Sequence, residues 1–231
     1  MLPSISKYKL YLYLFFLIFL SSIFNFRFLE NYQDKFSLKT ININGVYYEE
    51  KKNIEEELSN LKNTNIFKIT DNKVLEKLTK FNFIESINVK KIIPSSINVN
   101  LSKTSILGKT YINGEEFYIG KNGKFINSNQ IYGKYNTPTV FGEFQIKEFL
   151  GLYNILKNQQ LQIDSIEQYY FFKNRRWDLI FSDGLILKLP SKNIIDSIKI
   201  YKQLLNNDNF SNTKIIDLRV INQIVTTNKS E

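Results

Sequence analysis

The chain contains neither cysteine nor histidine in its 231 residues. Without cysteine there is no disulfide framework, thiolate nucleophile or cysteine-based metal site, and without histidine there is no imidazole acid, base or metal ligand. Catalysis would have to rest on carboxylates, lysine, tyrosine or a serine–lysine pair. We therefore expect no metal, no cofactor and no small-molecule substrate, and these absences favour a protein that is not an enzyme.

Motifs for phosphate binding or acid–base chemistry are also missing. The nearest glycine-rich segment, Gly120–Lys124, lacks the spacing of a phosphate-binding loop and lies between predicted strands rather than before a helix. The paired carboxylates at Glu49-Glu50, Glu55–Glu57 and Glu115-Glu116 lie on predicted helix surfaces or beside a turn. Such positions are typical of solvated surface charge.

The composition predicts a folded and basic protein. Hydrophobic residues make up 43% of the chain and aromatic residues 15%, which is sufficient for a packed core. The net charge is +9, but the 31 Lys and Arg residues are scattered along the sequence. A basic surface can bind nucleic acid or an anionic membrane. A general bias toward Lys and Asn explains the charge as well, so we expect no nucleic-acid partner.

The longest hydrophobic run is Leu10–Phe26, bracketed by Lys9 and Arg27 and free of charged residues. A helix of this length spans roughly 25 Å, slightly less than the ~30 Å hydrocarbon core of a bilayer but within the range of spanning helices. Leu, Ile and Phe dominate the run, so insertion into a membrane is predicted to be favourable. The run is interpreted as an uncleaved membrane anchor.

Two other interpretations of this run stay open. A cleaved signal peptide would have a basic start, which is present, but also a small-residue cleavage site, for which Ser21-Ser22 is a poor match. A buried helix of a soluble protein is the third possibility. Basic residues lie on both sides of the run, so their count does not decide its orientation.

After the run, residues 36–103 alternate between strand and helix patterns. The strands show apolar residues at every second position, and the helices show apolar stripes at a spacing of three to four. The predicted order is strand, helix, helix, strand, strand, over Phe36–Ile43, Tyr48–Leu61, Thr70–Phe81, Phe83–Ile93 and Ile97–Leu101.

From Lys103 onward the sequence predicts a mostly antiparallel sheet with flanking helices. Asn-Gly dipeptides at 113–114 and 122–123 separate short strands, because a type I′ turn needs a positive φ at both central residues. The predicted helices are Phe144–Asn158 and a segment beginning at Ser191 or Asn193. The later predicted strands are Thr139–Phe141, Ile163–Phe172, Arg176–Phe181, Leu185–Leu189 and Ile215–Val225.

These segments together resemble a known family. The strand SLKTININGV, the segment NIFKIT before the second helix and FNFIESINVKKIIPSSINVNL resemble a polypeptide-transport-associated (POTRA) domain. YYFFKNRRWDLIFSDGLILKLP and IIDLRVINQIVTTN then follow in the order of the FtsQ/DivIB family of cell-division proteins. The resemblance covers almost the whole of residues 10–231. The junction SKTSILG departs from it, since it lacks the Glu-Arg-x-Pro-like pattern often found there.

The resemblance implies an α+β fold and a bitopic protein of the inner membrane at the division septum. The N-terminus would lie in the cytoplasm and the body in the periplasm. The implied segments are a cytoplasmic tail (1–9), a transmembrane helix (10–26), a linker (27–35), a β-α-α-β-β POTRA domain (36–103), an FtsQ-type β domain (104–226) and a tail (227–231). The body would be a scaffold that binds FtsB-like and FtsL-like divisome proteins.

The resemblance also indicates where a partner would bind. A last strand with one unpaired edge can accept a partner strand through backbone hydrogen bonds. The segment that matches this strand is Val220, Ile221, Asn222, Gln223, Ile224, Val225 and Thr226, with Arg175, Arg176, Trp177 and Arg219 expected beside it. Core packing remains an alternative role for Trp177 and for Ile221, Ile224 and Val225.

The sequence leaves two other functions open. A POTRA protein of outer-membrane assembly or secretion would receive unfolded clients, but that class usually carries several POTRA copies and this sequence shows one. A membrane-tethered hydrolase would need two carboxylates that converge in a cleft.

Overall fold

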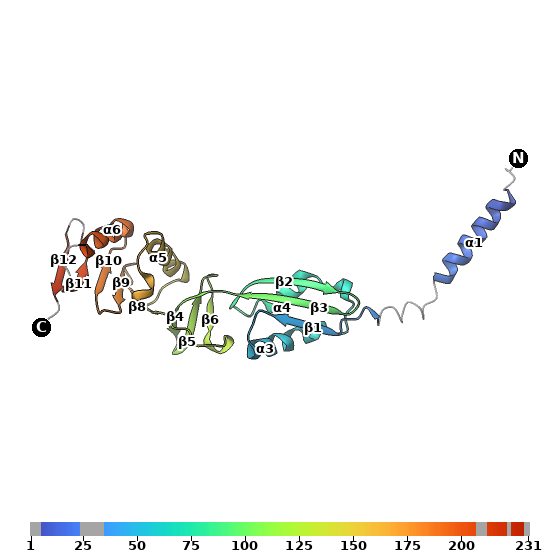
Figure 1. Ribbon diagram of the computed structural model, residues 1–231, viewed down its shortest axis with the longest axis horizontal. Coiled ribbons are helices and arrows are strands. Elements are labelled where there is room, and N and C mark those ends of the chain that lie inside the picture. Colours follow the sequence, from blue (N-terminus) through green and yellow to red (C-terminus); the bar gives the residue numbers. More distant parts are fainter. Residues whose placement is uncertain (1–5, 24–34, 207–211, 221–222, 229–231) are drawn as a thin grey trace. The chain divides into compact units, whose positions relative to one another are not determined.

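The structure is a computed structural model of the chain and describes residues 6–23, 35–206, 212–220 and 223–228. The chain divides into two compact units. The first consists of residues 1–79 and 87–101, and the second of residues 80–86 and 102–231. Figure 1 shows a helix-covered sheet in each unit.

Helix α1 spans Lys7–Ile23, and every residue in it from Leu10 to Leu20 is apolar or aromatic. The aromatic and aliphatic side chains from Leu10 to Leu20 are each at least 52% exposed. No helix of the described residues is both long and apolar enough to cross a membrane. Residues 24–26 of the predicted span lie outside the described ranges.

The first unit contains a three-stranded sheet with helices α3 and α4. Along the chain the order is β1 (Thr40–Asn44), α3 (Tyr48–Leu58), α4 (Asp71–Leu78), β2 (Ile84–Ile92) and β3 (Ser96–Lys103), with two short 3-10 helices at Ser59–Leu61 and Ile66–Lys68. The strand order is β1-β3-β2, and β1 runs parallel to β3 with Thr40 opposite Ser96. This β-α-α-β-β order is the one the sequence predicts.

Alternation and helical spacing place the apolar residues of this unit on its inner side. Ile43, Ile97 and Val99 of the sheet and Ile54 and Leu78 of the helices are each at most 3% exposed. The outer side of the sheet is polar, and the amides of Asn42 and Asn98 form a cross-strand hydrogen bond of 2.9 Å. One face of the sheet is therefore packed and the other solvated.

The second unit is built on a nine-stranded sheet of order β12-β11-β10-β9-β8-β7-β4-β5-β6. The sheet is mixed, because β4–β7, β7–β8 and β10–β11 are parallel pairs. The strands are β4 (Ile106–Ile112), β5 (Glu115–Gly120), β6 (Phe125–Asn127), β7 (Thr139–Phe141), β8 (Ile166–Phe171), β9 (Trp177–Phe181), β10 (Ile186–Leu189), β11 (Thr213–Asp217) and β12 (Val225–Asn228).

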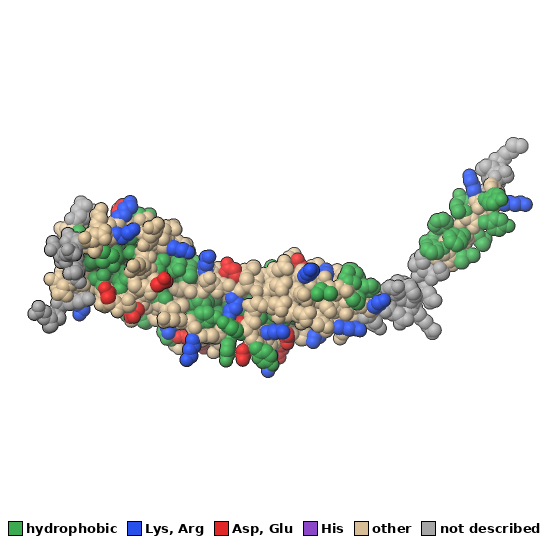
Figure 2. All heavy atoms as spheres, viewed as in Figure 1, with side chains coloured by type: hydrophobic (Ala, Val, Ile, Leu, Met, Phe, Trp, Pro, Cys, Tyr) green, Lys and Arg blue, Asp and Glu red, His purple; other side chains and the backbone are tan. Residues whose placement is uncertain are grey.

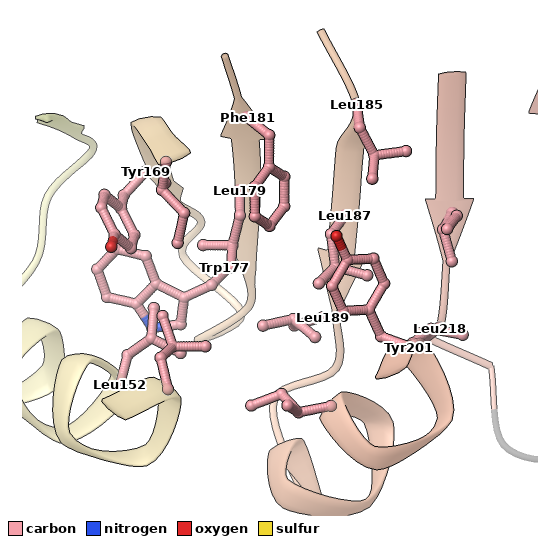
Figure 3. Packing of buried hydrophobic residues seen from close by; sticks show 14 of the residues in the cluster. Leu152, Tyr169, Trp177, Leu179, Phe181, Leu185, Leu187, Leu189, Tyr201 and Leu218 are labelled. Atoms are coloured by element: carbon pink, nitrogen blue, oxygen red, sulfur yellow. The ribbon is translucent and has the colours of Figure 1, made fainter. Parts of the chain in front are cut away.

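Two helices, α5 (Ile146–Asn158) and α6 (Ile194–Leu205), supply the buried side chains that pack against this sheet. Alternate residues of the central strands point into the resulting core, in which Trp177, Leu179 and Phe181 of β9 are each at most 6% exposed. Figure 3 shows Trp177 beside Tyr169 and Leu152, and Tyr201 of α6 near Leu187 and Leu189. The other residues of each strand lie on the opposite face of the sheet.

The two Asn-Gly turns differ. Asn113 and Gly114 have φ values of 52° and 84°, as a type I′ turn requires, and they join β4 to β5. At the second dipeptide the described positive-φ residues include Gly123, with φ 78°, but not Asn122. The Asn122 amide instead donates to the backbone oxygen of Asn82 at 2.9 Å. The type I′ prediction is confirmed at the first turn and wrong at the second.

Candidate partner-binding edge

Strand β12 forms one edge of the nine-stranded sheet. It pairs antiparallel with β11, with Val225 opposite Asp217 and Thr227 opposite Ile215. All four of its residues are exposed. No second described strand pairs with β12. Backbone groups along its outer side are thus available to another strand.

This last strand begins later than the sequence predicts. Residues 225–228 form β12, whereas Val220 lies in the connection after β11 and its carbonyl accepts from Gln223 N at 3.3 Å. Ile221 and Asn222 lie outside the described residues. Thr226 is within β12. The predicted extent of the strand, 220–226, is therefore corrected: among the described residues the strand begins at Val225 and ends at Asn228.

Apolar side chains of this region are exposed rather than packed in a core. The exposed fractions are 52% for Val220, 45% for Ile224 and 52% for Val225. The core-packing alternative is thus wrong for Ile224 and Val225. Exposed apolar residues that cluster beside an open sheet edge are typical of protein–protein contact sites.

A groove of about 650 Å³ lies between the start of α6 and the connection from β11 to β12. Its apolar lining comes from Ile200, Leu218, Val220 and Ile224, and its polar lining includes Lys192, Asp196, Gln203 and Arg219. The groove adjoins β12 through Ile224, the residue before the strand. A chain added at β12 would therefore have a partly apolar hollow next to it.

Arg219 is held by Asp217, two residues earlier. Its Nε donates to both carboxylate oxygens, at 2.8 and 2.9 Å, and its backbone N–H donates to Oδ1 at 3.0 Å. Burial acts to raise the pKa of Asp217, but the hydrogen bonds and positive charge of Arg219 outweigh it and hold that pKa below its ordinary value. Asp217 in turn raises the pKa of Arg219. This pair fixes the start of the connection to β12.

A row of charges crosses the sheet toward this edge. Asp178 of β9 lies opposite Lys188 of β10, Lys188 lies opposite Asp217 of β11, and Asp217 lies opposite Val225 of β12. Burial raises the pKa of Asp178, against the lowering influence of the charges on Lys188, Arg219 and Arg176. The row is a fixed pattern of alternating charge that ends at the open strand.

The two neighbouring arginines in the β8–β9 turn have different partners. Arg175 has a left-handed backbone, φ 62°, and its Nη2 contacts Glu148 Oε1 of α5 at 3.0 Å. The guanidinium of Arg176 instead lies over the Phe172 ring at 5.7 Å, and its charge acts on Asp178. The structure thus groups Arg176 with Arg219 around Asp178, whereas Arg175 is engaged with α5.

Trp177 faces the core. Its side chain packs against Phe171, Phe144 and Phe149, with ring centroids 4.8, 6.1 and 6.3 Å away, and the residue is 3% exposed. Its ring therefore presents no surface to a partner, and the core-packing alternative describes it. The predicted partner contact of Trp177 does not fit this burial.

Sequence reasoning missed Asp178, Lys188 and Asp217. Each is a charged residue at an alternate position within an apolar strand, in WDLIF, ILKL and TKIID respectively. That alternation places each charge on the face opposite the core, but it does not show that the three are neighbours. Their adjacency depends on the strand order and register.

Comparison with known proteins gives the class to which this arrangement belongs. The family model described as "POTRA domain, FtsQ-type" matches residues 36–103, and the one described as "Cell division protein FtsQ/DivIB, C-terminal" matches residues 110–219. A POTRA domain followed by this C-terminal domain defines a class of cell-division proteins. The chain belongs to the FtsQ/DivIB family.

The relatives agree with this assignment. The chain is 28% identical over 187 residues to "Cell division protein FtsQ" of Rickettsia bellii. The match covers 80% of this chain and 69% of that protein. It is 23% identical over 158 residues to the protein of the same name from Zymomonas mobilis, covering 68% of this chain and 50% of the relative. The match therefore spans half the length of the Zymomonas protein.

A solved structure is also similar. The major extracytoplasmic domain of the cell division protein DivIB from Geobacillus stearothermophilus matches 44% of this chain and 91% of that domain, with 12% identity and a TM-score of 0.31.

Proposed function

We propose that this chain is a non-catalytic scaffold of the division machinery that holds FtsB-like and FtsL-like proteins by strand addition at β12. The observation that carries the proposal is the exposed edge of β12, all four residues of which are exposed. Strand addition supplies affinity through backbone hydrogen bonds and specificity through side-chain pockets.

The surroundings of β12 support this mode of binding. The groove beside Ile224 provides an apolar hollow for a side chain of the partner, and Val225 adds exposed apolar surface at the strand itself. The Asp178–Lys188–Asp217 row gives the adjacent sheet face an alternating charge pattern. Charge patterns of this kind select partners and orient them during association.

We further propose that residues 10–26 anchor the chain in the inner membrane, with the N-terminus in the cytoplasm and both units in the periplasm at the septum. The support is α1, in which every side chain from Leu10 to Leu20 is apolar or aromatic and is exposed. A helix that is hydrophobic all round is found in a protein core or in a membrane.

The edge is tested by introducing charge on β12 in the full-length chain. The double variant Val225→Glu and Thr227→Glu is expected to abolish co-purification with the FtsB-like protein. An added strand would bury the two carboxylates, and removing their charges from water costs free energy. Ile112→Glu, at an exposed end of β4 in the same sheet, is the matched control and is expected to retain the partner. Unchanged co-purification of a folded β12 variant contradicts the edge as the binding site.

The cellular role is tested by depletion. Cells that lose the protein are expected to grow without septa and to form filaments, and complementation by the wild-type chain but not by the β12 variant is expected to restore division. Normal septation after complete depletion contradicts the proposed function.

A further inference from the structure

Three chain segments meet at the end of the first unit where residue 35 emerges from the linker. Residues 35–40 lead into β1, and the Phe36 carbonyl accepts from Ile66 N at 2.8 Å. Lys39 N donates to the carbonyl of Ser95 in the β2–β3 turn at 2.8 Å. Residues 62–69 and the end of the β2–β3 hairpin at 90–96 therefore lie beside the entry of the chain, and Figure 1 shows that hairpin.

This end of the unit is strongly basic. The three segments 35–40, 62–69 and 90–96 contain no Asp or Glu, and they carry lysines that are all exposed, namely Lys35, Lys39, Lys62, Lys68, Lys90 and Lys91. Figure 2 shows basic side chains gathered at this end.

Large apolar side chains are exposed among these lysines. The exposed fractions are 57% for Phe67, 42% for Ile92 and 57% for Ile93. The Phe67 ring packs on Phe36 with centroids 5.4 Å apart, so its position is fixed rather than free. Lysines around exposed aromatic and aliphatic side chains form the chemistry of surfaces that bind anionic phospholipid, in which the charges meet headgroups and the apolar groups enter the interface.

We propose that this surface, defined by Phe67, Ile92, Ile93 and the surrounding lysines, docks the first unit onto anionic phospholipid of the membrane that holds α1. The proposal rests on the proposed anchoring of residues 10–26. Residues 24–34 separate α1 from Lys35, and a chain of that length reaches at most about 40 Å. The surface is thus tethered close to a bilayer, and its charge is complementary to anionic headgroups. Docking would fix the distance of the unit from the membrane.

Because the chain has no cysteine, one introduced cysteine gives a unique labelling site. The full-length variants Ile93→Cys and Tyr48→Cys, labelled with a small fluorophore, are placed in nanodiscs of phosphatidylcholine with or without phosphatidylglycerol. Tyr48 is 78% exposed and follows the opposite end of β1. Brominated lipid is expected to quench the probe at position 93 several-fold more strongly than the probe at 48, and only in the anionic nanodiscs.

Lysine substitution tests the role of charge. The set Lys39→Gln, Lys68→Gln, Lys90→Gln and Lys91→Gln is expected to remove the extra quenching at position 93. A matched control set changes the net charge by the same amount on the second unit, and is expected to retain the extra quenching at position 93. It consists of Lys121→Gln, Lys124→Gln, Lys147→Gln and Lys157→Gln. Raised salt is expected to weaken the quenching, since exposed charges are screened over about 8 Å at physiological ionic strength.

The outcomes of these experiments distinguish a failure of the docking surface from a failure of the proposed membrane anchor. A chain that does not co-elute with nanodiscs of either composition contradicts the anchor and this surface together. Co-elution with equal quenching at positions 93 and 48, or extra quenching that survives the first lysine set, contradicts the docking surface alone.

Discussion

Asp178 and Lys188 lie directly opposite one another on β9 and β10, yet Asp178 Oδ1 is buried without a hydrogen-bond partner among the described residues. Asp178 is 9% exposed, and its burial raises the pKa of its carboxyl despite the cations around it. An acid with a raised pKa in the folded state takes up more protons when folded, so its ionisation destabilises the fold. The ionised form of Asp178 therefore reduces stability at neutral pH.

The first prediction concerns this residue. Asp178→Asn is expected to raise the free energy of unfolding at pH 7 by about 0.5–1 kcal/mol. The substitution removes the charge of a buried carboxylate whose Oδ1 accepts no hydrogen bond from the described residues. The gain is expected to be absent below the unfolded-state pKa of about 3.9 and complete above the raised pKa of the folded state. Urea unfolding at a series of pH values measures it. A gain that stays constant across this range would show that ionisation is not the cause.

Asp217 is predicted to behave in the opposite way. Its pKa is lowered by Arg219, so its ionised form stabilises the fold above about pH 3.9, and this stabilisation is lost as the pH falls through the lowered pKa. Asp217→Asn is expected to destabilise the second unit at pH 7 and to have little effect under strongly acidic conditions. The same pH series of urea unfolding checks this, with Asp183→Asn as an exposed control.

Substitutions at Trp177 distinguish a role in core packing from a role in partner binding. Trp177→Ala is expected to cost about 3–5 kcal/mol in unfolding free energy, as large-to-small substitutions in cores do, and Trp177→Phe much less. Thermal unfolding measures both. If Trp177→Ala unfolds like the wild type but loses the FtsB-like partner, the assignment of Trp177 to the core is wrong.

The two arginines of the β8–β9 turn are predicted to differ in binding. Arg175→Ala removes an exposed pair with Glu148, which is worth at most about 1 kcal/mol, and is expected to leave co-purification of the partner unchanged. Glu148 keeps the hydrogen bond from Gln145 N–H that contributes most to its lowered pKa. Arg176→Ala is expected to weaken binding in a salt-dependent manner. Equal effects of the two substitutions would contradict the grouping of Arg176 with the β12 site.

Alanine substitutions at Gly142 and Gly184 compare the cost of a positive φ with and without a steric clash of the added Cβ. Both have a positive φ, of 105° and 83°, but a Cβ on Gly142 would lie 2.2 Å from the Phe171 carbonyl oxygen, whereas nothing lies within 4 Å of one on Gly184. Gly184→Ala is expected to lower the free energy of unfolding by about 1 kcal/mol, because of its positive φ alone. Gly142→Ala is expected to lower it by at least about 2 kcal/mol more, because its Cβ also meets the Phe171 carbonyl. Urea unfolding of the two variants gives the comparison.

Much of this fold can be predicted from local sequence patterns. The stripe of Ile54 and Leu58 marks α3, and the Thr70 side chain accepts from Lys73 N at the start of α4 as an N-cap should. The Asn113-Gly114 hairpin follows from the φ preferences of its two residues. These features depend on residues that are close in sequence, and that information is present in a single chain.

The candidate site was less predictable because it depends on residues distant in sequence. A tryptophan between two polar residues fits either a surface or a core, and the choice for Trp177 depends on Phe144 and Phe149 from α5 and the loop before it. The apolar residues from Val220 to Val225 resemble a strand, but of the described ones, Val220, Ile224 and Val225, only Val225 pairs with β11. Likewise, periodicity does not give the parallel register that places Lys188 beside Asp217.

The link between β4 and β7 has a mechanical consequence. The two strands share one registered pair, Lys109 with Thr139, and a hydrogen bond of 2.9 Å from Lys109 N to Pro138 O, whereas β4 and β5 are registered from Ile106 to Ile112. If the ends of the chain are pulled apart, with α1 held at one end and β12 at the other, the load passes through this short contact. We expect the sheet to tear there first, which would leave β7–β12 joined as one piece. Such a seam would limit the force that the second unit can transmit.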